Sequence, residues 1–277
     1  MWSWDIKGEM RISELNGNLV VKFTDYLTGE PFYSFLGKHK TTETAKKLIE
    51  LSVKKGIVPK LNLIPEISTE GIDGKELELI EDRNHFDYIF SINKLTAYEG
   101  SEYARHRRKI RKFAQNNFEV VKLNLKDPTN QKLLLDLVEW WVRKNKENKE
   151  SEDYLGSEEL QNELYAFIRL VSSPIDLLEG LTCVALFVDG VLSGFIVNEK
   201  ISKDYCLAHF GKADIKHEGI YHFLMQQNAK VFLDLGVNYL NQEQDLGLPN
   251  LRFSKNIYRP INFLKKYSLA LKIGDKL

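Results

Sequence analysis

Two kinds of hydrophobic spacing alternate along the first half of the chain. Runs in which every second residue is apolar, or short apolar stretches bounded by turns, predict strands at 18–24, 32–37, 61–66, 85–92 and 118–125. Apolar positions three or four residues apart predict helices between Thr41 and Gly56 and at 101–115. The first half therefore predicts a lobe that mixes strands and helices.

The pattern starts again after Asp127-Pro128. It predicts helices at 130–146, 157–172 and 218–235, a hairpin at 181–200, and strands at 204–212, 237–242 and from Asn262 onward. The hairpin has Asp189-Gly190 as its two-residue turn. This order of elements resembles that of the GNAT acyltransferase fold. We therefore predict an α+β protein of two tandem GNAT-like lobes with mixed, mostly antiparallel sheets, at 1–126 and 127–277.

Charge and cysteine content narrow the classes of protein. The 39 basic residues balance 39 acidic ones, so any attraction to nucleic acid or membrane must be local. Cys183 and Cys206 lie in apolar segments, and their spacing matches neither a metal-binding motif nor a disulfide framework. This predicts that both are reduced core residues and that there is no metal site. No apolar run reaches the roughly 18 residues of a membrane span. The opening segment MWSWDIKGEM lacks the basic-then-apolar order of a secretory signal peptide. We expect a cytoplasmic protein without a transmembrane segment.

The segment EYARHRRKIRKF is the strongest charge feature. Helical spacing places one set of side chains on a basic face and a second set on a core-facing stripe. The basic face comprises Arg105, Arg108, Lys109 and Lys112, and the stripe comprises Tyr103, His106, Ile110 and Phe113. Such a patch suits phosphates of a nucleotide, an RNA backbone or lipid headgroups. The alternative is a solvated helix face.

The segment HFGKADIKHEGIYHFL leads into the helix at 218–235. In a GNAT-type fold this helix start holds the pyrophosphate of the acyl donor. Lys216, His217 and Gly219 are the candidate donor-binding residues, although the usual glycine-rich signature is missing. Coenzyme A binding here competes with the alternative of an ordinary capped helix start.

The stretch NQEQDLGLPNLRFSKNIYRP, residues 241–260, follows the strand at which a GNAT-type fold opens its cleft. A carboxylate there, Glu243 or Asp245, suits proton transfer from an attacking amine. The further binding candidates of this stretch are Asn241, Arg252, Lys255 and Tyr258. The alternative is a structural ion pair beneath the loop.

Three groups of residues are distinctive: ED-x-N-x-F-D-Y at 81–88, the basic helix, and N-x-EQDLG-x-P-x-LR-x-SK-x-x-Y-x-P at 241–260. All three resemble one bacterial family of unknown function, related to the C-terminal domain of phosphatidylglycerol lysyltransferases. FYSFLG and LIPE match as well, so the resemblance runs from about residue 18 to the end. It implies a tandem GNAT fold with a cleft near the junction of its halves. By position, Asp245, Arg252 and Lys255 match the family's polar motif, and Arg107, Arg108 and Lys109 lie in its basic helix.

Relatives in that wider group move an aminoacyl unit from an aminoacyl-tRNA onto an amine or hydroxyl. We therefore expect a transferase that works by direct attack, with Asp245 or Glu243 orienting or deprotonating the acceptor. Backbone N–H groups of 207–212 would stabilise the oxyanion, and the basic helix at 105–112 would bind the donor, tRNA. Aminoacyl-tRNA is favoured as the donor, and the acceptor is a small molecule, lipid or peptide. The alternatives are an acyl-CoA N-acyltransferase and a non-catalytic module that binds RNA or protein.

Overall fold

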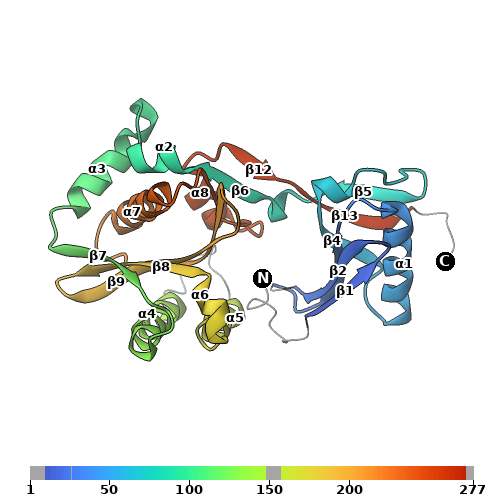
Figure 1. Ribbon diagram of the computed structural model, residues 1–277, viewed down its shortest axis with the longest axis horizontal. Coiled ribbons are helices and arrows are strands. Elements are labelled where there is room, and N and C mark those ends of the chain that lie inside the picture. Colours follow the sequence, from blue (N-terminus) through green and yellow to red (C-terminus); the bar gives the residue numbers. More distant parts are fainter. Residues whose placement is uncertain (1–9, 26, 148–156, 273–277) are drawn as a thin grey trace. The chain divides into compact units, whose positions relative to one another are not determined.

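The computed structural model describes residues 10–25, 27–147 and 157–272 (Figure 1). The opening residues, on which the expected lack of a secretory signal depends, lie almost wholly outside that part. The chain forms two compact units. Unit 1 is Met1–Asp87, Gln244–Leu248 and Phe263–Leu277, and unit 2 is Tyr88–Glu243 and Pro249–Asn262. Each unit is described by itself.

Within the described residues, unit 1 has a six-stranded sheet in the order β1-β2-β3-β4-β13-β5. The strands are β1 (Arg11–Leu15), β2 (Asn18–Thr24), β3 (Pro31–Leu36), β4 (Lys60–Pro65), β5 (Leu77–Glu81) and β13 (Lys266–Leu271). Helix α1 (Thr41–Lys54) packs its buried residues Ala45, Leu48 and Ile49 against Leu61 and Leu269. Short 3₁₀ turns follow β4 and β5, at Glu66–Ser68 and Arg83–His85.

Unit 2 has a seven-stranded sheet among its described residues, in the order β12-β6-β11-β10-β9-β8-β7. The strands are β6 (Asp87–Ser91), β7 (Phe118–Leu123), β8 (Leu181–Val188), β9 (Val191–Lys200), β10 (Tyr205–Ala213), β11 (Tyr239–Asn241) and β12 (Asn262–Leu264). Strands β7 to β10 form an antiparallel meander. Strand β11 pairs parallel with β10 and antiparallel with β6.

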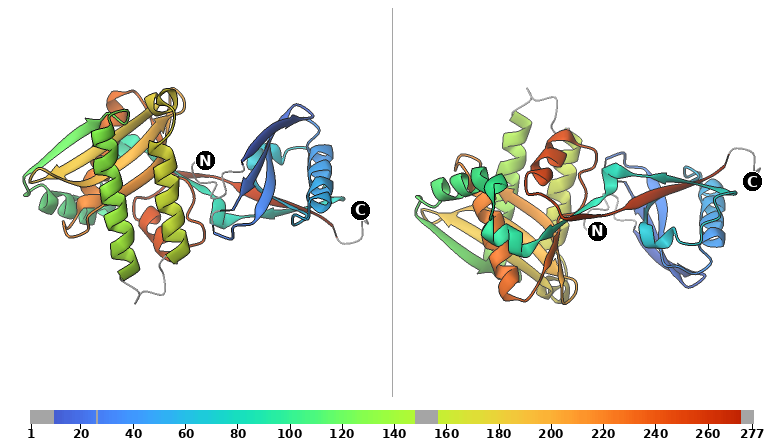
Figure 2. Two further views of the ribbon diagram at one scale, coloured as in Figure 1. Left: turned by 90° about the horizontal axis from the view of Figure 1, so that it is seen from below. Right: turned by 90° about the horizontal axis from the view of Figure 1, so that it is seen from above.

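Helices cover both faces of the unit 2 sheet. They are α2 (Ile92–Ala97), α3 (Ala104–Phe113), α4 (Pro128–Glu147), α5 (Ser157–Val171), α6 (Ile175–Glu179), α7 (Ile220–Asp234) and α8 (Pro249–Asn256), with a 3₁₀ turn at Ser101–Tyr103. In Figures 1 and 2, α4 and α5 lie on one face, while α7, with α2 and α3 beside it, lies on the other. The side chains of Phe167 and Phe195 meet in the core beneath α5, with ring centroids 5.4 Å apart.

The predicted α+β class, with two mostly antiparallel sheets flanked by helices, is confirmed. The predicted division at 126/127 needs correction, because that point lies between β7 and α4, inside unit 2. The reason is strand pairing across long sequence separations. Strand β7 pairs with β8, β6 pairs with β11, and β13 returns to lie between β4 and β5.

Other expectations concern the cysteines, the hairpin and the membrane. Cys183 and Cys206 are buried free thiols, as predicted, and burial raises the pKa of each to about 12. The turn at Asp189 and Gly190 has positive φ at both residues, 50° and 77°, as a two-residue hairpin requires. In the part of the chain that is described, no helix has the length and apolar character needed to cross a bilayer.

Candidate active site

Strands β10 and β11 separate soon after they begin to pair. Among the described residues, β11 pairs with β10 from Tyr205 to Leu207, opposite Tyr239 to Asn241. Strand β10 continues to Ala213 and stays paired with β9 on its other edge. The edge of β10 that faces β11 therefore has no β11 partner from Ala208 onward. An opening of this kind was predicted at the end of the strand before residue 241.

A β-bulge lies where the two strands separate. The register between β10 and β9 shifts between Ala208 and Phe210, so His209 is the extra residue. Bulges re-aim a side chain, and they are common beside active sites. The His209 ring is held between two carboxylates: its Nε2 atom lies 2.9 Å from Oε2 of Glu199, and its Nδ1 atom lies 3.4 Å from Oε1 of Glu243. The His209 side chain is only 9% exposed, whereas Glu243 retains 31% of its surface.

Glu243 is held in an unusual backbone conformation, with φ at 56°. The Oδ1 atom of Asn241 accepts a hydrogen bond from the Glu243 N–H at 2.6 Å, and the Glu243 carbonyl accepts one from the Tyr88 N–H at 3.1 Å. Burial alone would raise the pKa of Glu243, but the hydrogen bond and charge of His209 outweigh it and lower the pKa. The carboxylate is thus ionised at neutral pH and oriented toward the imidazole. Such a pair can hold an ammonium group or relay a proton.

Asp245, the other predicted catalytic carboxylate, belongs to unit 1. Its side chain has no exposed surface, and its Oδ2 atom lies 3.2 Å from Nη1 of Arg83. Its Oδ1 atom accepts the N–H of Gly247 at 2.9 Å. Gly247 has φ at 74°, and a Cβ there would come within 2.9 Å of the Asn84 side chain. This geometry corresponds to the structural ion pair that the sequence left open, and it leaves Asp245 no surface from which to reach an acceptor.

Helix α8 carries the predicted Arg252 and Lys255. Lys255 is buried, donates from Nζ to the carbonyl of Gln242, and lies 5.7 Å from the centre of the Tyr88 ring. It therefore fixes α8 to the segment that follows β11. Arg252 is partly exposed one turn earlier on the same helix. The predicted Tyr258 follows α8, and burial raises its pKa well above the usual range.

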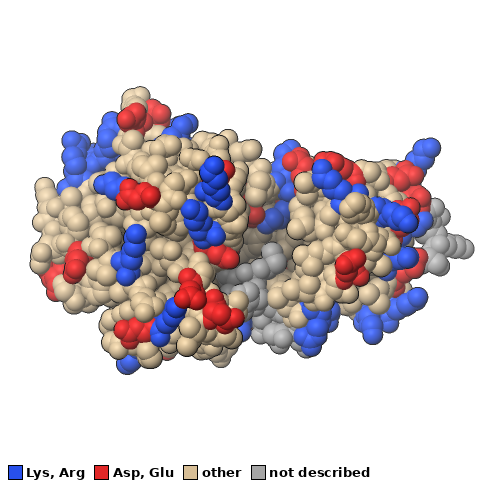
Figure 3. Space-filling view, in the orientation of Figure 1, with Lys and Arg blue, Asp and Glu red and all other residues tan. Residues whose placement is uncertain are grey.

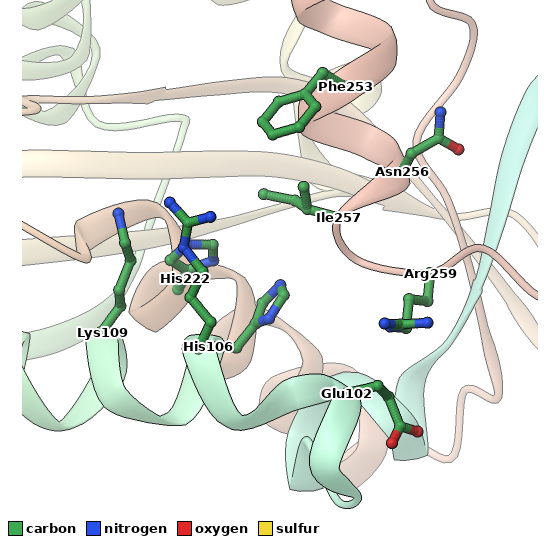
Figure 4. Close-up of a pocket in the computed structure, with 9 residues that line it drawn as sticks. Glu102, His106, Lys109, His222, Phe253, Asn256, Ile257 and Arg259 are labelled. Carbon is green, nitrogen blue, oxygen red and sulfur yellow. The ribbon is translucent and has the colours of Figure 1, made fainter.

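A cleft of about 450 Å³ lies between α3, α7 and α8, and we call it the α3–α8 cleft (Figure 4). It is lined by Glu102, Arg105, His106, Lys109, His222, Phe253, Asn256, Ile257 and Arg259. Figure 4 shows Lys109 and His106 rising from α3 toward Phe253 and Ile257, while the Glu102 carboxylate points to the opposite side. Lys and Arg side chains gather over α3 in Figure 3. The cleft thus combines two residues of the predicted basic face of α3, Arg105 and Lys109, with the end of α8.

The inner wall of the cleft is a cluster of rings. The centroids of His106 and His222 are 4.6 Å apart, and Tyr258 lies 5.4 Å from the first and 5.5 Å from the second. Burial, followed by the charges of Arg259 and Arg105, lowers the pKa of His106, against an opposing effect of the Ile257 backbone. Burial, followed by His106, lowers the pKa of His222 to about 4. Both imidazoles are therefore neutral at physiological pH.

The start of α7, predicted to hold the donor's pyrophosphate, is occupied by contacts with α3. Gly219 has φ at 88°, and a Cβ there would clash with the carbonyl oxygen of Lys109. Lys216 pairs with Asp214 at 2.9 Å. The ring of His217 meets that of Phe113 edge-on, with centroids 6.4 Å apart. The glycine therefore permits helix packing, and phosphate binding by Lys216 and His217 stays a prediction.

The predicted site residues thus fall into separate groups. Arg105 and Lys109 line the α3–α8 cleft, with Tyr258 behind it, and Glu243 contacts His209. Arg108 is exposed on α3 outside the cleft lining. The residues that the sequence did not single out are Glu199, His209, His222, Phe253, Asn256 and Arg259. Arg259 lies within residues 241–260, and its charge could have identified it as a candidate. The position of His209 depends on a β-bulge that no local sequence pattern predicts.

Comparisons with known proteins point to one family. The family model described as phosphatidylglycerol lysyltransferase, C-terminal, matches residues 24–270. A Bacteroides thetaiotaomicron protein described as conserved and of unknown function is 25% identical, with a TM-score of 0.80, and the match covers 98% of this chain and 88% of that one. A search of curated proteins finds no match.

More distant solved structures share the fold. The C-terminal domain of a putative lysylphosphatidylglycerol synthetase from Agrobacterium fabrum is 11% identical, with a TM-score of 0.66 over 96% of this chain and 84% of that one. L-PGS from Bacillus licheniformis is 14% identical, with a TM-score of 0.65 over 99% of this chain and 88% of that one. At these identities the likeness concerns the fold alone.

Proposed function

The chain belongs to the phosphatidylglycerol lysyltransferase C-terminal family, and from this membership we propose that it transfers an aminoacyl group from an aminoacyl-tRNA to an amine or hydroxyl acceptor. The observation that carries the proposal is the contact between His209 and Glu243 at the point where β10 leaves β11. It places a titratable pair beside an edge of backbone that β11 does not cover.

The proposed reaction is a direct displacement at the ester carbonyl of the donor. The acceptor nitrogen or oxygen attacks the carbonyl carbon while its proton passes to the carboxylate of Glu243, the more exposed member of the His209–Glu243 pair. The ester bond then breaks, and Glu243 returns the proton to the leaving oxygen of the tRNA terminal ribose, which departs as a hydroxyl. Glu243 is ionised and its backbone N–H is held by Asn241, while His209 contacts its carboxylate and keeps it oriented for this role.

Two further parts of unit 2 support the proposed reaction. Backbone N–H groups of β10 past its last pairing with β11, from Ala208 to Lys212, would stabilise the oxyanion of the tetrahedral intermediate. The exposed basic residues of α3, Arg105 and Arg108, supply the charge for the phosphates of the donor. Binding through phosphates positions the donor without reading its sequence.

The test uses tRNA charged with one radiolabelled amino acid at a time, mixed with acceptors of three classes: amines, alcohols and phospholipid vesicles. We expect one combination to give enzyme-dependent loss of label from tRNA and a product that carries the label. His209→Gln and Glu243→Gln should each slow transfer by about 100-fold or more, since general acid–base groups contribute about that much. Glu179→Gln is the matched control, because Glu179 forms an exposed pair with Lys126 in the same unit.

Two results would refute this assignment. If no charged tRNA is consumed with any acceptor class, the protein is not an aminoacyl transferase. If acyl-CoA releases thiol in a His209-dependent reaction while charged tRNA stays intact, the donor is an acyl thioester instead.

A further inference from the structure

The α3–α8 cleft concentrates positive charge around a small volume. Arg105 and Lys109 are one helical turn apart on α3, so both face the cleft, and Arg259 approaches from the end of α8. Glu102 also lines the cleft, but its carboxylate points away from it in Figure 4. A cavity lined in this way favours an anionic ligand over a neutral one.

Arg259 reaches the cleft through a strained backbone. Its φ is 57°, in the left-handed region, and it precedes Pro260, which disfavours helical backbone at that position. The N–H of Arg259 donates at 2.9 Å to the carbonyl of Asn256, the last residue of α8. The Arg259 guanidinium lies 5.7 Å from the centre of the Tyr103 ring. Strain of this kind persists where the surroundings enforce it, and here it directs a cation into the cleft.

Buried imidazole nitrogens in the cleft make no hydrogen bond of normal geometry within the described part of the protein, although the Ile257 backbone lies close enough to raise the pKa of His106. They are Nδ1 and Nε2 of His106 and Nδ1 of His222. His106 is only 5% exposed, so these nitrogens are shielded from bulk water. A neutral imidazole presents one donor and one acceptor, and buried groups of this kind are normally satisfied. A ligand that carries donor and acceptor groups beside its negative charge would satisfy these imidazoles and the cations together.

The outer wall of the cleft is apolar. Phe253 is 65% exposed although it is a large aromatic residue, and Ile257 directly follows the last residue of α8. An aromatic face beside polar edges suits a heterocyclic base, which stacks on the ring and hydrogen-bonds through its edge. The volume of about 450 Å³ is within the range of sites for small ligands.

We propose that the α3–α8 cleft binds a nucleoside monophosphate unit, with its phosphate on Arg105, Lys109 and Arg259, its base against Phe253, and its polar edge on His106 and His222. The same unit occurs as a free mononucleotide and as the terminal nucleotide of an RNA. The RNA source rests on the proposed function, whereas the nucleotide chemistry of the cleft does not.

Adenosine 5′-monophosphate and cytidine 5′-monophosphate are the probes, and titration calorimetry with the full chain is the measurement. Arg105→Ala should weaken binding by about tenfold or more, as expected for loss of one arginine contact to the ligand. Arg111→Ala removes the same charge from an exposed position of α3 outside the cleft, and binding should change less than about twofold. Equal weakening by both variants, or no binding of either probe, would overturn the proposal.

A second comparison separates a nucleotide site from a plain anion site. Inorganic phosphate should bind at least about tenfold more weakly than the nucleotides, because it has no base to stack on Phe253. His106→Phe keeps a ring in the cluster but removes its nitrogens, and it should weaken nucleotide binding while leaving phosphate binding unchanged. Thermal unfolding of the variant shows whether the ring cluster is retained. Phosphate that binds as tightly as a nucleotide would refute the assignment.

Competition by short RNA identifies the source. The probe in this experiment is radiolabelled adenosine 5′-monophosphate bound to the full chain. An oligonucleotide with a free 3′ end should displace it, and the same oligonucleotide with a 3′-phosphate should displace it less well. If neither oligonucleotide displaces the mononucleotide, and the mononucleotide still binds, the ligand of the cleft is a free nucleotide. Failure of aminoacyl transfer leaves these binding results unaffected, so the cleft and the proposed function fail independently.

Discussion

The Nδ1 atom of His209 lies 3.4 Å from Oε1 of Glu243, and the two residues come from either side of the point where β10 and β11 stop pairing. His209 is the bulge residue of β10, and Glu243 is the second residue after β11. Their sequence separation is large enough that only the parallel pairing of β10 with β11 brings them together. The proposed chemistry therefore depends on the topology of the unit 2 sheet.

Glu243→Gln should lower stability in a pH-dependent way. The folded-state pKa of Glu243 is below its ordinary value. Its contribution to the free energy of unfolding is therefore present above the unfolded-state pKa, near 4.3, and is lost as pH falls through the folded pKa. We expect the variant to be less stable by about 1 kcal/mol or less at neutral pH, since the carboxylate is partly exposed. Urea unfolding at a series of pH values measures this difference. A difference that grows as pH falls below 4 would contradict it.

Asp245→Asn should affect stability more than catalysis. The change removes the charge that pairs with Arg83 but keeps an oxygen for the Gly247 N–H. We expect a loss of about 2 kcal/mol, less than the cost of breaking a fully buried pair because Arg83 is 37% exposed. Urea unfolding gives the stability, and transfer assays of the folded variant should show kcat within about threefold of the original. A 100-fold fall in kcat at unchanged stability would return Asp245 to the role of catalytic base.

The sequence predicts unit 2 better than it predicts the site. The stripe of His106, Ile110 and Phe113 on α3 is buried as predicted, because helical periodicity follows directly from local spacing. The contact of His209 with Glu243 is not predictable in this way. It requires a one-residue bulge in β10, and an extra residue in a strand leaves no mark in the pattern of hydrophobic residues.

Long-range pairing also limits what the sequence shows about Asp245. Its motif, DLG, directs attention to catalysis because a carboxylate after a strand is the usual position for a base. The partner that neutralises it, Arg83, is 162 positions away in the chain. The same limitation applies to the division of the chain, since the short segment Gln244–Leu248 and the terminal strand β13 belong with residues before 88. The spacing of residues along the chain cannot show that a late segment packs with a unit formed by the first part of the sequence.

Gly219→Ala should destabilise the protein because of the contact between α3 and α7. The added Cβ would meet the Lys109 carbonyl, and the residue has φ at 88°. Gly236→Ala is the matched control: φ is 74° there, but no atom lies within 4 Å of the added Cβ. We expect a loss of about 1 kcal/mol for Gly236→Ala from backbone strain and roughly twice that for Gly219→Ala. Thermal and urea unfolding measure both. If Gly219→Ala is no worse than the control yet abolishes coenzyme A binding, Gly219 belongs to a donor site instead.

Binding of tRNA should depend on salt through the exposed face of α3. Arg108 is exposed on this helix and outside the cleft lining, so its expected role is contact with backbone phosphates. Each phosphate contact contributes about 0.7 to 0.9 to the slope of log affinity against log salt. Arg108→Ala should reduce the magnitude of the slope by about one contact and weaken all tRNAs equally. Lys132→Ala is the control, because Lys132 is exposed on α4 and pairs with Asp136. Filter binding over a salt series measures both variants. An unchanged slope in Arg108→Ala would exclude this face of α3 from the tRNA interface.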